Sequence, residues 1–170
     1  EMDLASRSMS FDAMAKHLKD PAHGIDIILV DCPSGFGMIS TMIMTVADLV
    51  VIPTPPLFFA IRALRETISY LNRLRRDASV FVAVVMTMFE ADSSLHSVMV
   101  KKVRRDWGDL VVPFEIPREE SVERAAIESK LLIDQFPGAE SAKAYRKLAA
   151  SFAVRLGFDV KAPHLDVPVP

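Results

Sequence analysis

The chain has 170 residues, enough for one domain with a buried core. Hydrophobic residues make up 51% and charged residues 25%, a balance that excludes a disordered segment and a membrane bundle. The net charge of −2 provides no overall attraction for nucleic acid, and the single cysteine excludes an internal disulfide. The longest apolar stretch, 38–53, contains Asp48 and is shorter than the roughly 20 residues of a membrane span. Without a signal peptide or lipidation motif in view, we expect a cytoplasmic protein that does not bind membranes.

Hydrophobic periodicity predicts helices and strands that alternate along the chain. In chain order we expect a helix at 4–18, a strand at 25–30, a helix at 38–46, a strand at 49–53, a helix at 58–76, a strand at 80–86, a helix from 93 or 94 to 107, a strand at 110–116, and helices at 119–129 and 140–156. The strands are continuous apolar runs, which is typical of a mostly parallel sheet with helices on both faces. We therefore predict one α/β domain over 1–160, followed by an extended, proline-rich tail at 161–170.

Ligands of such sheets bind at the carboxyl ends of the strands. Asp31 directly follows the first apolar run, and a carboxylate at this position is able to hold Mg²⁺ through water. Gly35 and Gly37 follow it as conformationally free positions, suited to a loop that moves with a ligand. From the strand and its aspartate alone, a structural role for Asp31 in capping the next turn is an equally good hypothesis.

Six short segments resemble, in the same order, motifs of the ParA-type partition ATPases, relatives of MinD. Their motifs are D-C-P-P-S-x-G, A-D-x-V-x-I-P, P-x-x-F-A, T-M-[YF], I-P-R and A-x-x-Y. The matching segments of this chain are 31–37, 47–53, 56–60, 87–89, 116–118 and 142–145. Each segment is a weak signal alone, but their common order indicates membership of this P-loop NTPase-like family.

The resemblance implies an ATPase that forms a dimer around ATP and Mg²⁺, binds DNA non-specifically and is stimulated by a ParB-like partner. It implies that Asp31 is the Walker B carboxylate on Mg²⁺ and that the loop with Gly35 and Gly37 is the switch. It also implies that Pro117 and Arg118 lie near the adenine. Met88, at the end of a strand, is expected to face the same base.

The phosphate-binding loop of the family, K-G-G-x-G-K-[ST], does not occur in this sequence. None of the six glycines precedes a lysine, and the only G-x-G pattern, at 35–37, follows the Walker B segment. We therefore do not expect this chain to hydrolyse a nucleotide unaided. It is either the C-terminal part of a complete ATPase, lacking the P-loop βαβ unit, or a shortened relative without catalysis. The motifs that the resemblance places around the nucleotide are still present, which favours the first hypothesis. That hypothesis predicts an exposed strand edge.

Acidic residues replace basic or neutral ones where family members contact DNA. The segment 90–93 reads Glu-Ala-Asp-Ser instead of D-A-R-T, and 116–121 reads Ile-Pro-Arg-Glu-Glu-Ser instead of I-P-R-N-x-R. DNA binding is therefore expected to be weak and salt-sensitive. A substitute patch is formed by Lys101, Lys102, Arg104 and Arg105, although a solvated helix face is the favoured interpretation of these four.

Two other functions fit the same sequence. The first is a non-catalytic module that keeps the sheet to bind a ParB-like or cargo partner. The second is a MinD-like positioning ATPase. The proline-rich tail disfavours the second, because those proteins end in an amphipathic membrane helix that prolines would break.

Overall fold

The computed structural model describes residues 11–18, 20, 24–74 and 80–158. The predicted tail at 161–170 and the first part of the predicted helix 4–18 lie outside these residues. The helices are α1 (Phe11–Leu18), α2 (Met38–Val46), α3 (Phe58–Leu74), α4 (Ser94–Trp107), a 3₁₀ turn η3 (Gly108–Leu110), α5 (Glu120–Ile127), α6 (Leu132–Gln135) and α7 (Glu140–Arg155). The strands are β1 (Leu49–Thr54) and β2 (Phe81–Met86).

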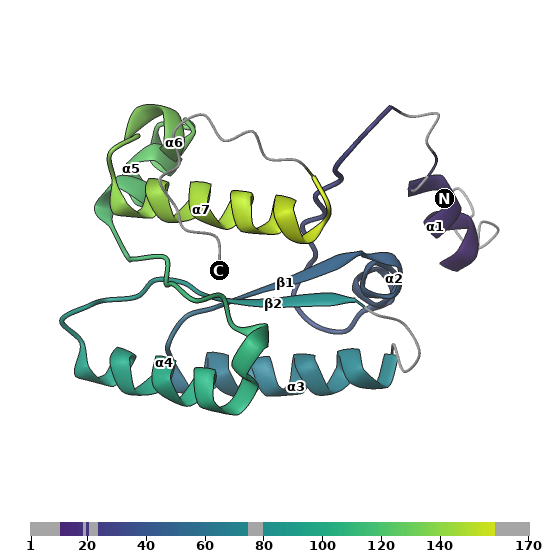
Figure 1. Ribbon diagram of the computed structural model, residues 1–170, viewed down its shortest axis with the longest axis horizontal. Coiled ribbons are helices and arrows are strands. Elements are labelled where there is room, and N and C mark those ends of the chain that lie inside the picture. Colours follow the sequence, from purple (N-terminus) through teal and green to yellow (C-terminus); the bar gives the residue numbers. More distant parts are fainter. Residues whose placement is uncertain (1–10, 19, 21–23, 75–79, 159–170) are drawn as a thin grey trace, which may run out of the picture.

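The two strands form a parallel sheet in full register. The pairing runs from Leu49 opposite Phe81 to Thr54 opposite Met86. The α3 helix connects the carboxyl end of β1 to the start of β2, as a parallel pair requires. The structure therefore confirms the predicted mixed α/β fold with a parallel sheet (Figure 1).

The predicted strand at 110–116 is present only as two isolated parallel bridges, so this prediction was wrong in extent. One bridge joins Val111 to Val84, and the other joins Pro117 to Phe89. Between them the chain bends at 113–114. Pro113 has no backbone N–H to donate, which explains why the ladder is interrupted there.

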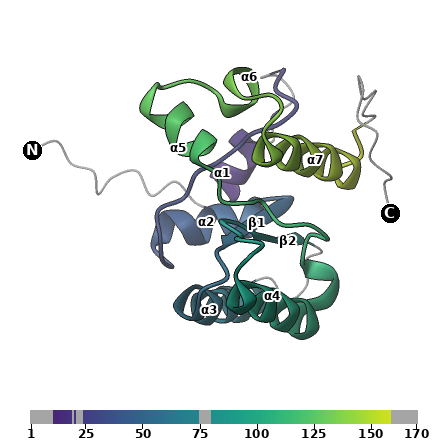
Figure 2. The ribbon, with the colours of Figure 1, turned by 90° about the vertical axis from the view of Figure 1, so that its left-hand side faces the viewer.

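Helices cover both faces of this sheet, as the alternation of side chains along β2 requires (Figures 1 and 2). Val84 and Met86 belong to a core that includes buried residues of α3 and α4. Ala83 and Val85 belong to a second core, completed by Val112, Ile116 and Leu148 of α7. All four β2 residues are at most 1% exposed. The sheet is thus the middle of three layers.

The predicted strand at 25–30 is not formed. Residues 25–30 have no sheet pairing with the described residues, and all of them are exposed, Leu29 by 92%. In Figure 1 this segment runs as an extended line toward α2. A strand exists only where a neighbour offers hydrogen bonds, and no described segment does so here. The apolar, β-branched sequence was therefore not sufficient to make this run a strand.

Where a predicted helix boundary lies among the described residues, it agrees with the structure to within a few residues. Of the two predicted start positions of α4, 93 and 94, the structure makes Ser93 the cap. Its Oγ accepts a hydrogen bond from His96 N at 3.2 Å, and Gly108 ends the helix with φ of 46°. The four-residue α6 was not predicted, because one turn is too short to show periodicity. Within the described residues, no helix has both the length and the apolarity needed to cross a membrane.

Candidate functional site

The carboxyl ends of β1 and β2 form a polar rim with the chain that follows β2. Thr87 N donates to Thr54 O at 3.1 Å, which extends the pairing by one residue beyond the strands. Thr54 is buried, with 2% exposure, whereas Met88 is 52% exposed. The sheet therefore ends in an ordered backbone edge that presents the Met88 side chain to solvent.

The structure brings the three predicted base-side residues, Met88, Pro117 and Arg118, together at this rim. Phe89 N donates to Ile116 O at 3.1 Å, and Arg118 N donates to Phe89 O at 2.9 Å. These two bonds hold 88–90 beside 116–118, although they are 28 residues apart in sequence. We call 88–90 together with 116–118 the base-side rim.

An ion pair and a hydrogen bond to a histidine stabilise the base-side rim. Arg118 Nη1 lies 3.0 Å from Glu90 Oε1, and both side chains are partly exposed. Glu90 N donates to His96 Nδ1 at 3.2 Å, which ties the rim to the first turn of α4. Glu90 stands where the D-A-R-T motif also has an acid, so it is not one of the acidic replacements. Its structural partner is the arginine beside it.

Met88 has an unusual backbone conformation for a residue with a side chain. Its φ is 54°, in the left-handed region that favours glycine. Strained backbone is often found at functional sites. No sequence signal indicated this conformation, because it is imposed by the turn from β2 into the base-side rim.

The structure does not join Asp31 to the base-side rim. Asp31 lies in the exposed, extended segment before α2 and makes no hydrogen bond or ion pair with another described residue. Among the described residues, no three His, Cys, Asp or Glu side chains form a group suited to a metal ion. Asp31 would supply Mg²⁺ with one carboxylate ligand, and water or phosphate would fill other positions. One carboxylate fits Mg²⁺ only in part.

The loop with Gly35 and Gly37 is fastened to α2 and α3. The ring of Phe36, between the two glycines, stacks on Tyr70 of α3 with centroids 4.3 Å apart. Thr41 Oγ1 lies 2.8 Å from the Tyr70 hydroxyl, and Ser40 Oγ donates to Pro33 O at 3.2 Å. Gly35 adopts φ of 93°, which only glycine accepts easily. Tyr70 and Thr41 were missed by the sequence reasoning, since their contacts come from packing alone.

This attachment lies toward the end of the sheet at which the strands begin, whereas the base-side rim lies at the end at which they finish. The α3 helix starts after the carboxyl end of β1, and Tyr70 is twelve residues beyond its first residue, about 18 Å along the axis. The structure therefore shows the glycine loop docked on α3 and separated from the base-side rim.

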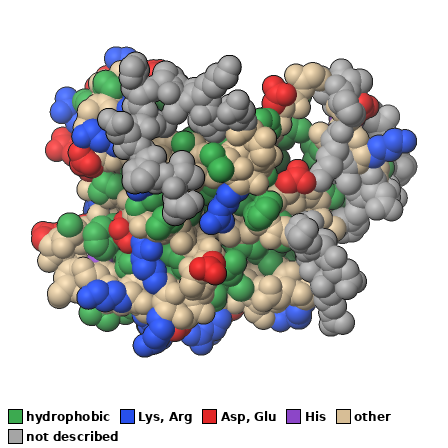
Figure 3. Space-filling view, in the orientation of Figure 1, with side chains coloured by type: hydrophobic (Ala, Val, Ile, Leu, Met, Phe, Trp, Pro, Cys, Tyr) green, Lys and Arg blue, Asp and Glu red, His purple; other side chains and the backbone are tan. Residues whose placement is uncertain are grey.

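Most of the basic residues on α4 have acidic partners. Arg104 Nη2 lies 2.6 Å from Glu115 Oε1. Lys102 and Arg105 both contact Asp106, at 3.4 Å and 3.2 Å. Of the four, only Lys101 has no ion pair with a described residue. Figure 3 shows Lys and Arg side chains mixed with acidic ones over the layer of α3 and α4.

Comparison with known proteins relates this chain to a family. A family described as an AAA domain matches residues 1–84. The chromosome partitioning protein ParA of Caulobacter vibrioides is 31% identical over 125 residues, which is 72% of this chain and 47% of that protein. The sporulation initiation inhibitor protein Soj of Bacillus subtilis is 26% identical over 131 residues, 75% of this chain and 52% of that protein. The chromosome-partitioning ATPase Soj of Treponema pallidum is 24% identical over 159 residues, 92% of this chain and 62% of that protein.

The parallel sheet covered by helices, with its polar rim at the strand ends, defines a P-loop NTPase-like α/β protein. More narrowly, the chain belongs to the ParA-type partition ATPase family. It spans about half the length of the curated relatives that it matches.

Proposed function

We propose that the complete protein is a partition ATPase that uses Mg-ATP to switch between a monomer and a dimer and acts in DNA segregation in the cytoplasm. The observation that carries this proposal is the base-side rim. It joins Met88, Pro117 and Arg118, which the family resemblance assigns to the adenine, at the carboxyl ends of a parallel sheet. The relatives named for chromosome partitioning support the biological role.

Within this proposal the rim residues bind the base and the family's phosphate loop binds the triphosphate. The Met88 thioether and the Pro117 ring offer apolar surface to a flat base. The Arg118 guanidinium offers hydrogen-bond donors next to it. Asp31 is the metal ligand in the bound state. Because its segment makes no sheet contact, this role requires 25–37 to take a different position when nucleotide is present.

A direct test is calorimetry of the complete protein with Mg-ATP, followed by ATPase assays with DNA and a ParB-type partner. We expect ATP binding and partner-stimulated turnover. The Arg118→Ala and Asp31→Asn variants should weaken ATP binding and abolish turnover, respectively. A complete protein that binds no ATP in the presence of Mg²⁺ would overturn the proposal.

The proposed DNA contact is weak. Three of the four cations on α4 already have carboxylate partners, and an ion pair must be broken or shared before its cation can neutralise a phosphate. We therefore assign Lys101, Lys102, Arg104 and Arg105 at most an auxiliary role in non-specific binding.

The exposed apolar segment 25–30 supports a second candidate, a non-catalytic module that binds a ParB-like or cargo partner. This second hypothesis predicts that the isolated chain is well folded, binds such a partner and has no affinity for Mg-ATP. Measurable ATP turnover by the isolated 170-residue chain would reject it.

A further inference from the structure

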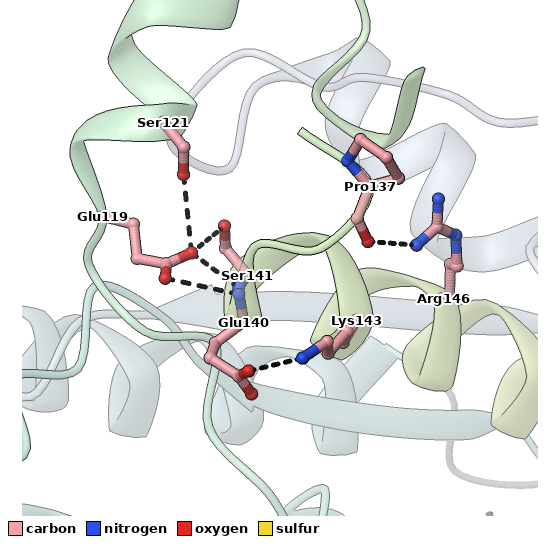
Figure 4. Close-up of polar contacts among 7 residues, drawn as sticks. All are labelled: Glu119, Ser121, Pro137, Glu140, Ser141, Lys143 and Arg146. Carbon is pink, nitrogen blue, oxygen red and sulfur yellow. Dashed lines mark hydrogen bonds and ion pairs between the residues drawn. The ribbon is translucent and has the colours of Figure 1, made fainter. Parts of the chain in front are cut away.

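The start of α7 is capped by a residue from a distant part of the chain. The N-cap position of α7 is occupied by Ala139, whose side chain cannot accept a hydrogen bond. The carboxylate of Glu119 takes its place. Glu140 N lies 3.3 Å from Glu119 Oε1, and Ser141 N lies 2.7 Å from Glu119 Oε2. Figure 4 shows the carboxylate facing the first turn of α7.

Side-chain contacts strengthen this cap. The hydroxyl of Ser141, which is fully buried, also donates to Glu119 Oε2, and Ser121 Oγ donates to the same oxygen at 3.5 Å. The Ser141 hydroxyl, its backbone N–H and that of Glu140 lower the pKa of Glu119 below its usual value. A negative charge is also stabilised at the start of a helix by the helix dipole. The contact is therefore a charge-assisted hydrogen-bond network.

The α7 end of this contact is fixed to the sheet. Ala142, the residue after Ser141, is completely buried, and Leu148 is 9% exposed. Leu148 packs in one core with Val85 of β2 and with Ile116, the first residue of the rim segment 116–118. The first turn of α7 is thus held in place by the core, and it fixes the position of the Glu119 carboxylate that is bonded to it.

The other end of the contact is the residue that leaves the base-side rim. Glu119 directly follows Arg118, whose backbone N–H is bonded to Phe89 O. Glu119 has extended φ and ψ of −140° and 141° and is the N-cap residue of α5. Its carboxylate therefore determines where the chain goes immediately after Pro117 and Arg118.

We infer that Glu119 is a positioning residue for nucleotide-base binding, because it ties the base-side rim to the first turn of α7. This inference rests on the proposed function of the rim. It also changes the interpretation of an acidic replacement. The sequence suggested that an acid at 119 weakens DNA binding, whereas its contacts on the described residues lie within the protein, on α7 and α5.

The test compares Glu119→Ala with Glu120→Ala in the complete protein. Glu120 is the adjacent acid, is exposed, and has no side-chain hydrogen bond or ion pair with a described residue, so it controls for the loss of one negative charge. The ligands are ATP, whose base is proposed to contact the rim, and inorganic tripolyphosphate, which has no base. Both dissociation constants are measured with Mg²⁺ by calorimetry, and circular dichroism reports folding.

We expect Glu119→Ala to weaken ATP binding about tenfold and to leave tripolyphosphate binding unchanged. Glu120→Ala should change neither, and Glu119→Gln, which keeps an acceptor oxygen, should recover part of the ATP affinity. Unchanged ATP affinity in a folded Glu119→Ala protein overturns the inference while leaving the proposed function intact. Equal losses for ATP and tripolyphosphate also overturn it, since they indicate a general structural defect. If the unmodified complete protein binds tripolyphosphate but not ATP, the base-side assignment fails and the inference fails with it.

Discussion

Phe36 and Tyr70 stack with ring centroids 4.3 Å apart and an angle of 25° between their planes. This pair connects a loop between two glycines to the outer helix α3. The hydroxyl of Tyr70 adds a 2.8 Å hydrogen bond to Thr41 at the start of α2. One side chain thus holds both the loop and the helix that follows it. The mobility that the proposal requires of this loop has to begin with the release of Tyr70.

Removing Tyr70 should loosen the glycine loop. We expect Tyr70→Phe to lower the free energy of unfolding by about 1 kcal/mol, because it loses the hydrogen bond to Thr41 but keeps the ring. Tyr70→Ala should cost about 2 kcal/mol, because it also loses the stacking on Phe36. Urea denaturation measures both values, and limited proteolysis reports cleavage within 33–37. Asn72→Ala, at an exposed position of the same helix, is the control. Equal cleavage rates for Tyr70→Ala and Asn72→Ala would contradict the attachment.

Replacing Met88 with glycine should raise the stability of the fold but lower the affinity for ATP. Met88 has φ of 54° and an exposed side chain, so Met88→Gly should stabilise the fold by up to about 1 kcal/mol. The same change removes a side chain that the proposal places on the base, so ATP affinity should fall. Ser129, with φ of 52° in the turn after α5, is the matched control.

In the complete protein, Ser129→Gly should give a similar gain in melting temperature with no change in ATP affinity. Thermal unfolding and calorimetry on the two variants provide these values. An unchanged ATP affinity in Met88→Gly would remove Met88 from the base site. A loss of stability in both variants would show that the positive φ is not a source of strain.

Glu119 should make stability depend on acid pH. Its pKa in the folded protein is lowered from the ordinary 4.5, chiefly by the hydroxyl of Ser141. A lowered folded pKa means that the unfolded chain takes up the proton first as pH falls. The stabilisation is therefore complete well above pH 4.5 and is lost as the pH falls through the lowered pKa. Unfolding free energies of the unmodified protein and Glu119→Gln, measured from neutral pH to below pH 4, should converge at the acid end. A difference that is independent of pH would contradict this account.

The ion pair between Arg104 and Glu115 should leave little of Arg104 for DNA. In the complete protein, we expect Arg104→Ala to destabilise the fold by about 1 kcal/mol and to change DNA affinity hardly at all. Lys101→Ala, which breaks no ion pair among the described residues, should instead reduce the slope of log affinity against log salt by about one, if Lys101 contacts a phosphate. Filter binding over a range of salt concentrations tests both. A steeper loss of DNA affinity for Arg104→Ala than for Lys101→Ala would show that the ion pair opens on binding.

The sequence was a good guide where local physical chemistry decides the outcome. Apolar residues at helical spacing located α3, because Ile61, Leu64, Ile68 and Leu71 form its buried face. A continuous apolar run located β2, since both of its faces are covered. The I-P-R and T-M-F segments lie on two stretches that meet at the base-side rim. These features depend on neighbours within a few residues or on a motif.

Only the tertiary structure decided the remaining features, because they depend on partners far away in the sequence. The run 25–30 has the composition of a strand but no pairing partner among the described residues, and a strand requires one. Glu119 and Ser141 are 22 residues apart, and Thr41 and Tyr70 are 29 apart. No sequence pattern connects such pairs, since they come together only when the helices pack on the sheet. The sequence thus determined most of the helices, the two paired strands and the family, whereas packing determined which charges are paired and which residues hold the rim in place.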